Sequence, residues 1–126
     1  MVYQNEKAIY IRIAERICDD ILSGHYAEGS RVPSVREIAA AYEVNPNTAM
    51  RAVEILQRDE VVYQQRGIGV FVAEGARRKI LAARKEDFLR HDIPEFLRRL
   101  QLLGMGIEEV VRAWEQNQEV NKDLKK

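Results

Sequence analysis

The sequence has few of the residues from which covalent or metal-bound sites are built. It has one cysteine, Cys18, and two histidines, His25 and His91, in 126 residues. A single cysteine excludes an intrachain disulfide and a cysteine-based zinc site. Because Cys18 falls on the apolar side of a predicted helix, we interpret it as a buried thiol rather than a redox sensor. The histidines are far apart and lack a carboxylate–histidine pattern, so we expect neither a metal nor another cofactor.

Long apolar runs are also absent. No run approaches the roughly 18 residues that a membrane span needs, and the stretch Met1–Lys7 lacks the apolar core of a signal peptide. The hydrophobic fraction of 46% and the charged fraction of 32% are typical of an ordinary globular protein. We therefore expect a cytoplasmic protein with no membrane partner.

The chain has no excess of charge of either sign, because 20 Lys and Arg balance 20 Asp and Glu. Residues 1–75 carry 8 basic and 11 acidic side chains, a net charge of −3, and residues 76–126 carry 12 and 9, a net charge of +3. Many nucleic-acid-binding proteins have a basic excess. A DNA-binding hypothesis for this chain therefore depends on where a few arginines lie.

No catalytic arrangement stands out. We find no Ser-His-Asp, Cys-His or paired-carboxylate pattern. The segment Arg66–Gly69 has only two glycines and joins two predicted strands, so it is not a phosphate loop. We do not expect an enzyme.

The first predicted helix is about 15 residues long and carries Ile9, Ile13, Ile17 and Ile21. Isoleucine recurs at every fourth residue within it, which produces the apolar stripe of an amphipathic helix. Gly24 follows as a stop signal. Residues 25–31 include Gly29 and are expected to form a loop.

Two short helices follow, each with its own start signal. Ser34 and Glu37 have the spacing of a capping box. This helix must end near Glu43, because Asn45 and Pro46 begin the next one: asparagine is a good N-cap, and proline suits the first helical position.

The third helix is expected to end near Arg58 or Asp59, and β-forming residues follow. Val61–Gln65 and Ile68–Val72 are predicted strands joined by a tight turn at Arg66-Gly67, which makes a β-hairpin. The expected buried face of the third helix consists of Ala49, Ala52, Val53 and Leu56. Its expected exposed face consists of Asn47, Thr48, Arg51, Glu54 and Arg58.

This order of elements is that of a winged helix-turn-helix, in which the hairpin is the wing. The second helix of the pair enters the major groove of DNA, where asparagine can read adenine and arginine can read guanine or hold phosphate. Free N–H groups at the start of both helices are expected as further phosphate donors. We therefore expect residues 1–75 to form a DNA-binding domain.

The remaining residues, 76–126, have the composition of a helical tail. A helix is predicted from Ala76 to Arg90, and Asp92–Pro94 indicates either a new helix or a proline kink in a longer one. Gly104–Gly106 is a break before a last helix over Ile107–Gln118. Asn117–Lys126 is polar and is expected to fray. The fold class is thus mainly α with a small β-hairpin.

The tail has more large apolar side chains than it can bury by itself. About 50 residues are marginal for a separate core, and burial against a second copy would contribute roughly 1.5–3 kcal/mol for each fully buried side chain. We therefore expect a homodimer formed by the tail. The expected interface residues are Ile80, Leu81, Phe88, Phe96, Leu100, Leu103, Val111 and Trp114.

Several motifs together resemble the GntR family of bacterial repressors. The segments that carry the resemblance, continuous over residues 8–73, are Ile21–Gly24, Pro33–Ala39, Val44–Thr48, Arg51-Ala52 and Arg66–Val72. The Val-Asn-Pro-Asn-Thr segment and the short helical tail look like the YtrA subfamily, whose members often repress neighbouring genes for ATP-binding-cassette transporters. Two departures stand out: Asp59-Glu60 replaces a glycine that many members have after the third helix, and Met50 replaces an arginine that is frequent outside the YtrA group.

The resemblance implies operator DNA as the partner, bound as an inverted repeat by a dimer. It implies DNA contacts by Ser34, Arg36, Asn45, Asn47, Thr48, Arg51, Arg66 and Gly67. It leaves the effector unknown.

Less specific interpretations remain open for these residues. Arg36, Arg51 and Arg66 could be solvated surface charges, Asn45 could serve only as a cap, and Thr48 could cap or pack. The near-neutral charge is also compatible with a winged helix that binds protein instead of DNA. An enzyme with an unrecognised site is the third and least supported hypothesis.

Overall fold

The computed structural model describes residues 8–124 and divides into two compact units, 1–84 and 85–126. The segment Met1–Lys7, where no signal peptide is expected, and the last two residues of the polar C-terminus lie outside the described residues. The tail predicted from the sequence begins at residue 76, whereas residues 76–84 belong to unit 1.

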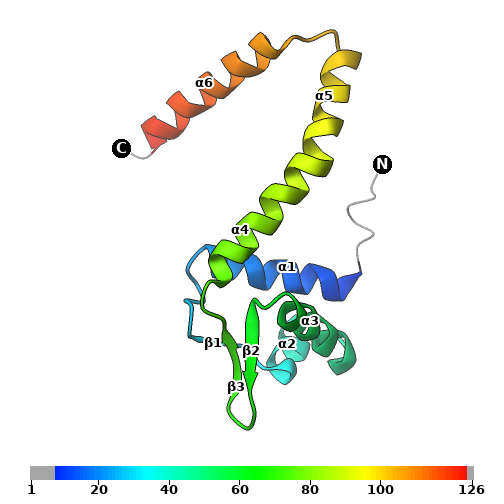
Figure 1. Ribbon diagram of the computed structural model, residues 1–126, viewed down its shortest axis with the longest axis vertical. Coiled ribbons are helices and arrows are strands. Elements are labelled where there is room, and N and C mark those ends of the chain that lie inside the picture. The colour runs from blue at the N-terminus through cyan, green and yellow to red at the C-terminus, as the bar shows by residue number, and fades with distance from the viewer. Residues whose placement is uncertain (1–7, 125–126) are drawn as a thin grey trace. The chain divides into compact units, whose positions relative to one another are not determined.

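Unit 1 contains three helices, a small sheet and the first part of a fourth helix (Figure 1). The sheet has three antiparallel strands in the order β1-β3-β2. The elements are α1 (Ile9–Leu22), β1 (Arg31–Val32), α2 (Val35–Tyr42), α3 (Pro46–Arg58), β2 (Val62–Gln65), β3 (Gly69–Val72) and α4 (Ala76–Asp87). The winged helix-turn-helix expected from the sequence is confirmed.

The helix boundaries follow from local hydrogen bonds. The Ser34 hydroxyl oxygen accepts a hydrogen bond from the Glu37 N–H at 3.1 Å, and the Glu37 carboxylate accepts one from the Ser34 N–H at 3.0 Å. Glu43 ends α2 in the left-handed conformation, with φ 53°. The Asn45 side chain then caps α3 by accepting the Asn47 N–H at 2.8 Å. The predicted capping box and asparagine cap are confirmed.

The core of unit 1 lies where α1, α2, α3 and the inner face of the sheet meet. The isoleucine stripe of α1 is buried from Ile13 to Ile21, and α2 adds Ile38, only 1% exposed. The predicted buried face of α3 is confirmed, because Ala49, Ala52, Val53 and Leu56 are all buried. This packing leaves the opposite face of α3 in solvent.

One strand of the sheet is not predicted by the sequence. The prediction that residues 25–31 form a loop is wrong at its last residue, because Arg31 and Val32 pair with Phe71 and Val70 as β1. The backbone pairing continues beside the strand, where the Val72 N–H donates to the Ser30 carbonyl at 2.9 Å. A two-residue strand is too short to show alternation, and it forms because the hairpin offers an unpaired edge.

The first residues of α4 are part of the core of unit 1. Ala76 is fully buried and Ile80 is 4% exposed. The Glu28 carboxylate accepts hydrogen bonds from the Gly75 N–H at 2.9 Å and the Arg77 N–H at 3.3 Å, and so caps the start of α4. Ile80, predicted from sequence as a dimer-interface residue, is thus already removed from solvent within one chain.

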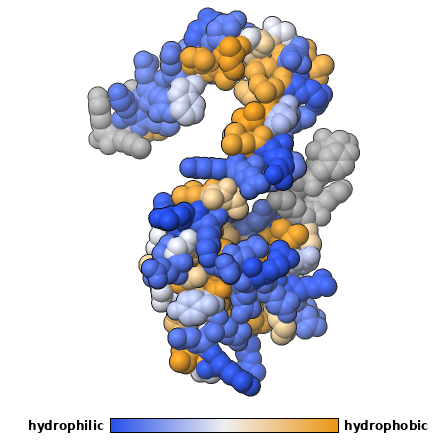
Figure 2. All heavy atoms as spheres, viewed as in Figure 1, coloured by the Kyte–Doolittle hydropathy of each residue, from blue (hydrophilic) through white to orange (hydrophobic). Residues whose placement is uncertain are grey.

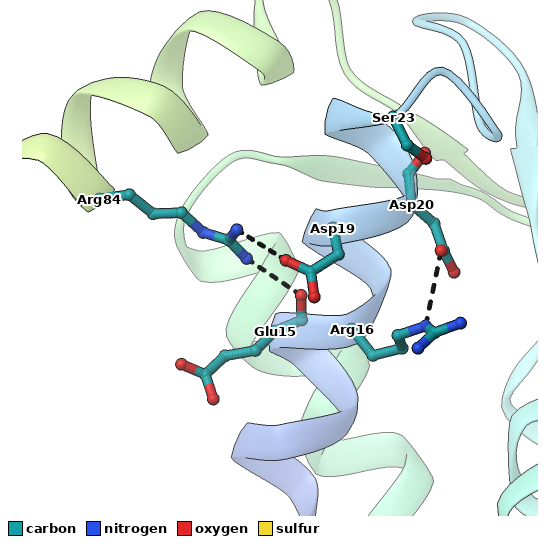
Figure 3. A network of polar contacts seen from close by, with 6 residues as sticks. All are labelled: Glu15, Arg16, Asp19, Asp20, Ser23 and Arg84. Carbon is teal, nitrogen blue, oxygen red and sulfur yellow. Dashed lines mark hydrogen bonds and ion pairs between the residues drawn. The ribbon is translucent and has the colours of Figure 1, made fainter. Parts of the chain in front are cut away.

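A polar network joins the end of this segment to α1 (Figure 3). The Arg84 guanidinium lies 2.6 Å from the Asp19 carboxylate and donates to the Glu15 carbonyl at 3.1 Å. On α1 itself, Arg16 pairs with Asp20 at 3.6 Å. These contacts explain why residues up to Arg84 form one unit with the winged domain.

The regular secondary structure in residues 85–124 of unit 2 is helical. The end of α4 continues through a π-helical turn, Phe88–Asp92, into α5 (Ile93–Leu102), and α6 (Ile107–Leu124) follows the break at Gly104–Gly106. The sequence left open a new helix or a kink at Pro94. The structure has a continuous helical path, in which the wider turn accommodates a proline that has no N–H to donate.

Helix α6 is longer than predicted. The expectation that Asn117–Lys126 frays is wrong as far as Leu124, because α6 extends to that residue. This stretch has no glycine or proline, and Gln118, Glu119, Lys122 and Leu124 have good helix propensity. None of the helices in residues 8–124 is long and apolar enough to cross a membrane.

Candidate nucleic-acid interface

The exposed face of α3 is the centre of the candidate interface. Asn47, Met50, Arg51 and Glu54 are exposed and Thr48 is half-buried. Together these five side chains line a shallow depression of about 430 Å³. Amide, hydroxyl and guanidinium groups are the side chains that hydrogen-bond to base edges, so this face has the chemistry of a recognition helix.

Two backbone N–H groups at the start of α3 already have partners within the helix cap. Pro46 has none, the Asn47 N–H donates to the Asn45 side chain, and the Thr48 N–H donates to the Asn45 carbonyl at 2.9 Å. The expected phosphate donors at the start of α3 are therefore reduced to the Asn45 N–H, which has no partner within residues 8–124. The cap also leaves the Asn45 side-chain amide group as a donor at this position, since only its oxygen is occupied.

The start of α2 combines a negative and a positive side chain. The Ser34 hydroxyl accepts the Glu37 N–H, and it also hydrogen-bonds to the Glu37 carboxylate. Two hydrogen bonds from Ser34 and the charge of Arg31 hold the pKa of the Glu37 carboxyl below its ordinary range, and this carboxylate occupies the Ser34 N–H. Arg36 is exposed and supplies the charge that a phosphate would need.

The turn between β2 and β3 forms the exposed tip of the wing. Arg66, Gly67 and Ile68 are exposed in the turn between β2 and β3, and Ile68 is 60% exposed. Gly67 has φ 79°, a conformation in which residues with a side chain are strained. The predicted wing tip at Arg66-Gly67 is therefore the turn itself.

Two neighbours of this surface were not predicted from sequence. The ring of Tyr10, on α1, lies under the Arg51 guanidinium, and the Arg31 side chain crosses the backbone of Gly69. Both contacts join residues far apart in the chain. No periodicity or capping rule could have revealed them.

The residues predicted for the dimer interface lie in different environments. Ile80 is buried in unit 1, and Leu100 is 8% exposed, buried within unit 2. The remaining candidates keep exposed apolar surface, with Leu103 at 69% and Trp114 at 64%. Figure 2 shows apolar residues gathered at the surface of unit 2. The exposed candidates are Leu81, Phe88, Phe96, Leu103, Val111 and Trp114.

Fold and surface together define a winged helix-turn-helix DNA-binding protein. Residues 9–72 match the family model described as bacterial regulatory proteins, gntR family. The chain belongs to this family. It is therefore a DNA-binding transcriptional regulator and not an enzyme.

Full-length relatives extend the similarity into the tail. The chain is 34% identical over 111 residues to YhcF of Bacillus subtilis, an uncharacterised HTH-type transcriptional regulator, covering 88% of this chain and 90% of that one. It is 26% identical over 117 residues to the HTH-type transcriptional repressor YtrA of the same organism, covering 93% and 87%.

Solved structures show the same architecture. A putative GntR-family regulator from Bacteroides thetaiotaomicron is 49% identical with a TM-score of 0.78, covering 90% of this chain and 99% of that one. A GntR-family regulator from Listeria monocytogenes is 33% identical with a TM-score of 0.71, covering 89% and 96%. The similarity thus includes the helices of the tail.

Proposed function

We propose that this regulator is a cytoplasmic repressor that binds an inverted-repeat operator as a homodimer. The observation that carries the proposal is the solvent-facing side of α3, where Asn47, Thr48 and Arg51 share one surface on a winged helix-turn-helix. A relative with similar length and 26% identity is a transcriptional repressor. The resemblance to the YtrA subfamily supports an operon for an ATP-binding-cassette transporter as the target.

The roles follow from the hydrogen bonds that each side chain has left. Asn47, Thr48 and Arg51 read base edges in the major groove. Arg36 and Asn45 hold the phosphate backbone through a guanidinium and an amide group, and Ser34 lies beside them at the start of α2. Arg66 and Gly67 bring the wing to the minor groove or the adjacent backbone.

Dimer formation is proposed to involve the tail helices. Unit 2 has a depression of about 370 Å³ with a mostly apolar lining, which includes Phe96, Leu103 and Val110 beside the charged Arg99 and Glu109. Exposed apolar side chains of this size on α5 and α6 favour burial against a second copy. A two-fold dimer presents two recognition helices to successive turns of the DNA, which requires an inverted repeat.

Mobility-shift titration tests the DNA-binding part. The DNA upstream of the protein's own operon is titrated at low and moderate salt, with scrambled DNA as competitor. We expect a competitor-resistant shift that maps to an inverted repeat. The variants Arg36→Ala and Arg51→Ala should weaken it, whereas Arg112→Ala in α6 should not. If neither operon DNA nor duplexes selected from random DNA shift, the proposal is wrong, and a protein-binding winged helix becomes the better account.

Sedimentation tests the dimer separately. We expect a concentration-dependent dimer for the wild type and monomers for the double variant Leu103→Lys, Trp114→Lys, because two charges would be placed in the apolar interface. The control Glu119→Lys, also exposed on α6, should remain dimeric. A monomeric wild type at micromolar concentration that still binds an inverted repeat would contradict the tail dimer.

A further inference from the structure

Arg31 belongs to a segment that was predicted from the sequence to be a loop, and no functional role was predicted for it. It is exposed in the edge strand β1, opposite Phe71 of β3. Val32 and Val70 are buried beneath this sheet. Because side chains alternate along a strand, the side chain of Arg31 lies on the outer face of the sheet, together with those of Phe71 and Tyr63.

The side chain of Arg31 leans toward the wing turn. A Cβ atom on Gly69 would lie 2.8 Å from Nε and 3.3 Å from Cζ of Arg31. The guanidinium therefore crosses the Gly69 backbone, two residues from Gly67 in the turn. Glycine at position 69 leaves the space in which this side chain lies.

The same guanidinium is close to the start of α2. The charge of Arg31 contributes to the lowered pKa of the Glu37 carboxyl, after the two hydrogen bonds with Ser34. Within residues 8–124, Arg31 forms no hydrogen bond or ion pair that would neutralise its charge. An exposed guanidinium without a hydrogen-bond or ion-pair partner among the described residues thus lies between the wing and α2.

We propose that Arg31 is an additional phosphate-binding residue, which holds the DNA backbone where it passes between the wing and the start of α2. This inference rests on the proposed function, because both neighbours of Arg31 adjoin residues assigned to DNA: Gly69 adjoins the Arg66-Gly67 turn, and Glu37 adjoins Arg36. A guanidinium presents a planar fork of N–H groups that matches two phosphate oxygens. The ligand is a phosphodiester group, with no preference for base sequence.

The positive charge of the Arg31 guanidinium also offsets the negative charge of the nearby Glu37 carboxylate. Glu37 would repel a phosphate near the Ser34 hydroxyl, and a second cation in addition to Arg36 lowers that repulsion. This arrangement places positive charge at the DNA surface although residues 1–75 carry a net charge of −3, from 8 basic and 11 acidic side chains.

The test measures operator affinity across a salt series for the wild type, Arg31→Gln, Arg31→Lys and Arg78→Gln. Arg31→Gln removes the charge and keeps a polar side chain of similar reach. Arg78→Gln removes the same charge from the first turn of α4, which follows the end of the hairpin remote from its turn. Thermal unfolding of each variant by circular dichroism establishes that all are folded at the assay temperature.

We expect Arg31→Gln to reduce the slope of log K against log salt by about 2, because the homodimer loses one phosphate contact in each half-site. Operator and scrambled DNA should lose affinity by the same factor. Arg31→Lys should keep the slope because it keeps the charge, and Arg78→Gln should behave as the wild type.

Three results would overturn the Arg31 assignment while leaving the regulator proposal intact: an unchanged slope for Arg31→Gln, an equal loss for Arg78→Gln, or a loss confined to the operator, which would indicate base reading. Failure of the wild type to bind any duplex has a different meaning, because it removes the proposed function itself.

Discussion

The guanidinium of Arg51 lies over the ring of Tyr10, with Cζ 5.3 Å from the ring centroid. This distance is within the range of a cation–π interaction. The two residues come from α3 and α1, so the first helix of the domain orients a side chain of the recognition helix. An arginine restricted in this way loses less conformational entropy when it contacts DNA.

Replacing Tyr10 should therefore weaken operator binding without removing a DNA contact. We expect Tyr10→Leu to lower affinity by about 5-fold or more, because ordering the two Arg51 side chains of a dimer would then cost roughly 0.5 kcal/mol or more each. Tyr10→Phe keeps the aromatic face and should bind as the wild type. Fluorescence anisotropy with labelled operator measures both. An equal loss for Phe and Leu would show that the hydroxyl, rather than the ring, is responsible.

The turn after α3 contains a strained residue that glycine should relieve. Glu60 has φ 60°, and an L-residue in this conformation costs roughly 1–2 kcal/mol. Glu60→Gly removes this strain. The variant also loses the exposed ion pair between the Glu60 carboxylate and Lys79 at 3.4 Å, which contributes little to stability. We expect a net gain of about 0.5–1 kcal/mol in the free energy of unfolding, because the more flexible unfolded state of glycine offsets part of the relief.

Urea denaturation measures this gain, and Asp59→Gly is the matched control. Asp59 has φ −82°, so glycine relieves nothing there and should be neutral or destabilising. A gain at Asp59 equal to that at Glu60 would refute the strain argument.

The sequence predicts those parts of the fold that depend on neighbours in the chain. The capping box at Ser34 and the cap at Asn45 are contacts over two or three residues. Contacts over long separations were not predictable. Pairing of Arg31 with Phe71 and stacking of Arg51 on Tyr10 depend on how the helices and the hairpin pack.

The same limit applies to the tail residues. Periodicity indicates that Ile80 is buried but cannot indicate against which element. The structure buries it in unit 1, where Glu28 and Arg84 attach the segment through contacts that span more than 45 residues. The sequence could predict an apolar face, whereas the core that receives it is a tertiary property.

Ile80 and Leu103 should therefore respond differently to truncation. Ile80 is 4% exposed and Leu103 is 69% exposed. We expect Ile80→Ala to lower the free energy of unfolding by about 2–5 kcal/mol, the usual cost of a cavity. Leu103→Ala should weaken the dimer while changing the stability of the DNA-binding unit by less than about 0.5 kcal/mol. Urea denaturation at several protein concentrations separates the two effects, and a loss at Ile80 that vanishes at high concentration would contradict its assignment to the monomer core.

Acid should weaken the attachment of α4 to the winged domain. Hydrogen bonds from the Gly75 and Arg77 N–H groups hold the pKa of the Glu28 carboxyl below its ordinary value of 4.5. A lowered folded-state pKa contributes stability above the unfolded pKa and loses it as pH falls through the folded value. We expect Glu28→Gln to lower Tm at pH 7 and to reduce the decrease in Tm below pH 4.5. The control Glu54→Gln should leave both unchanged, and an identical acid dependence for Glu28→Gln and the wild type would contradict the role of this carboxylate.

Cys18 should be unreactive in the folded protein. Burial raises the pKa of its thiol from 9.0 to about 11, although the nearby charge of Arg84 opposes the shift. The thiolate is the reactive species, so at pH 8 its population should be about 100-fold lower than in the unfolded chain. Iodoacetamide labelling followed by mass spectrometry should be slow in buffer and fast in denaturant. The raised pKa also predicts that the stability of the folded protein falls as pH rises from 9 toward 11, because the thiol loses its proton first in the unfolded state. Labelling at equal rates in the folded and unfolded states would contradict both expectations and would favour a redox role for Cys18.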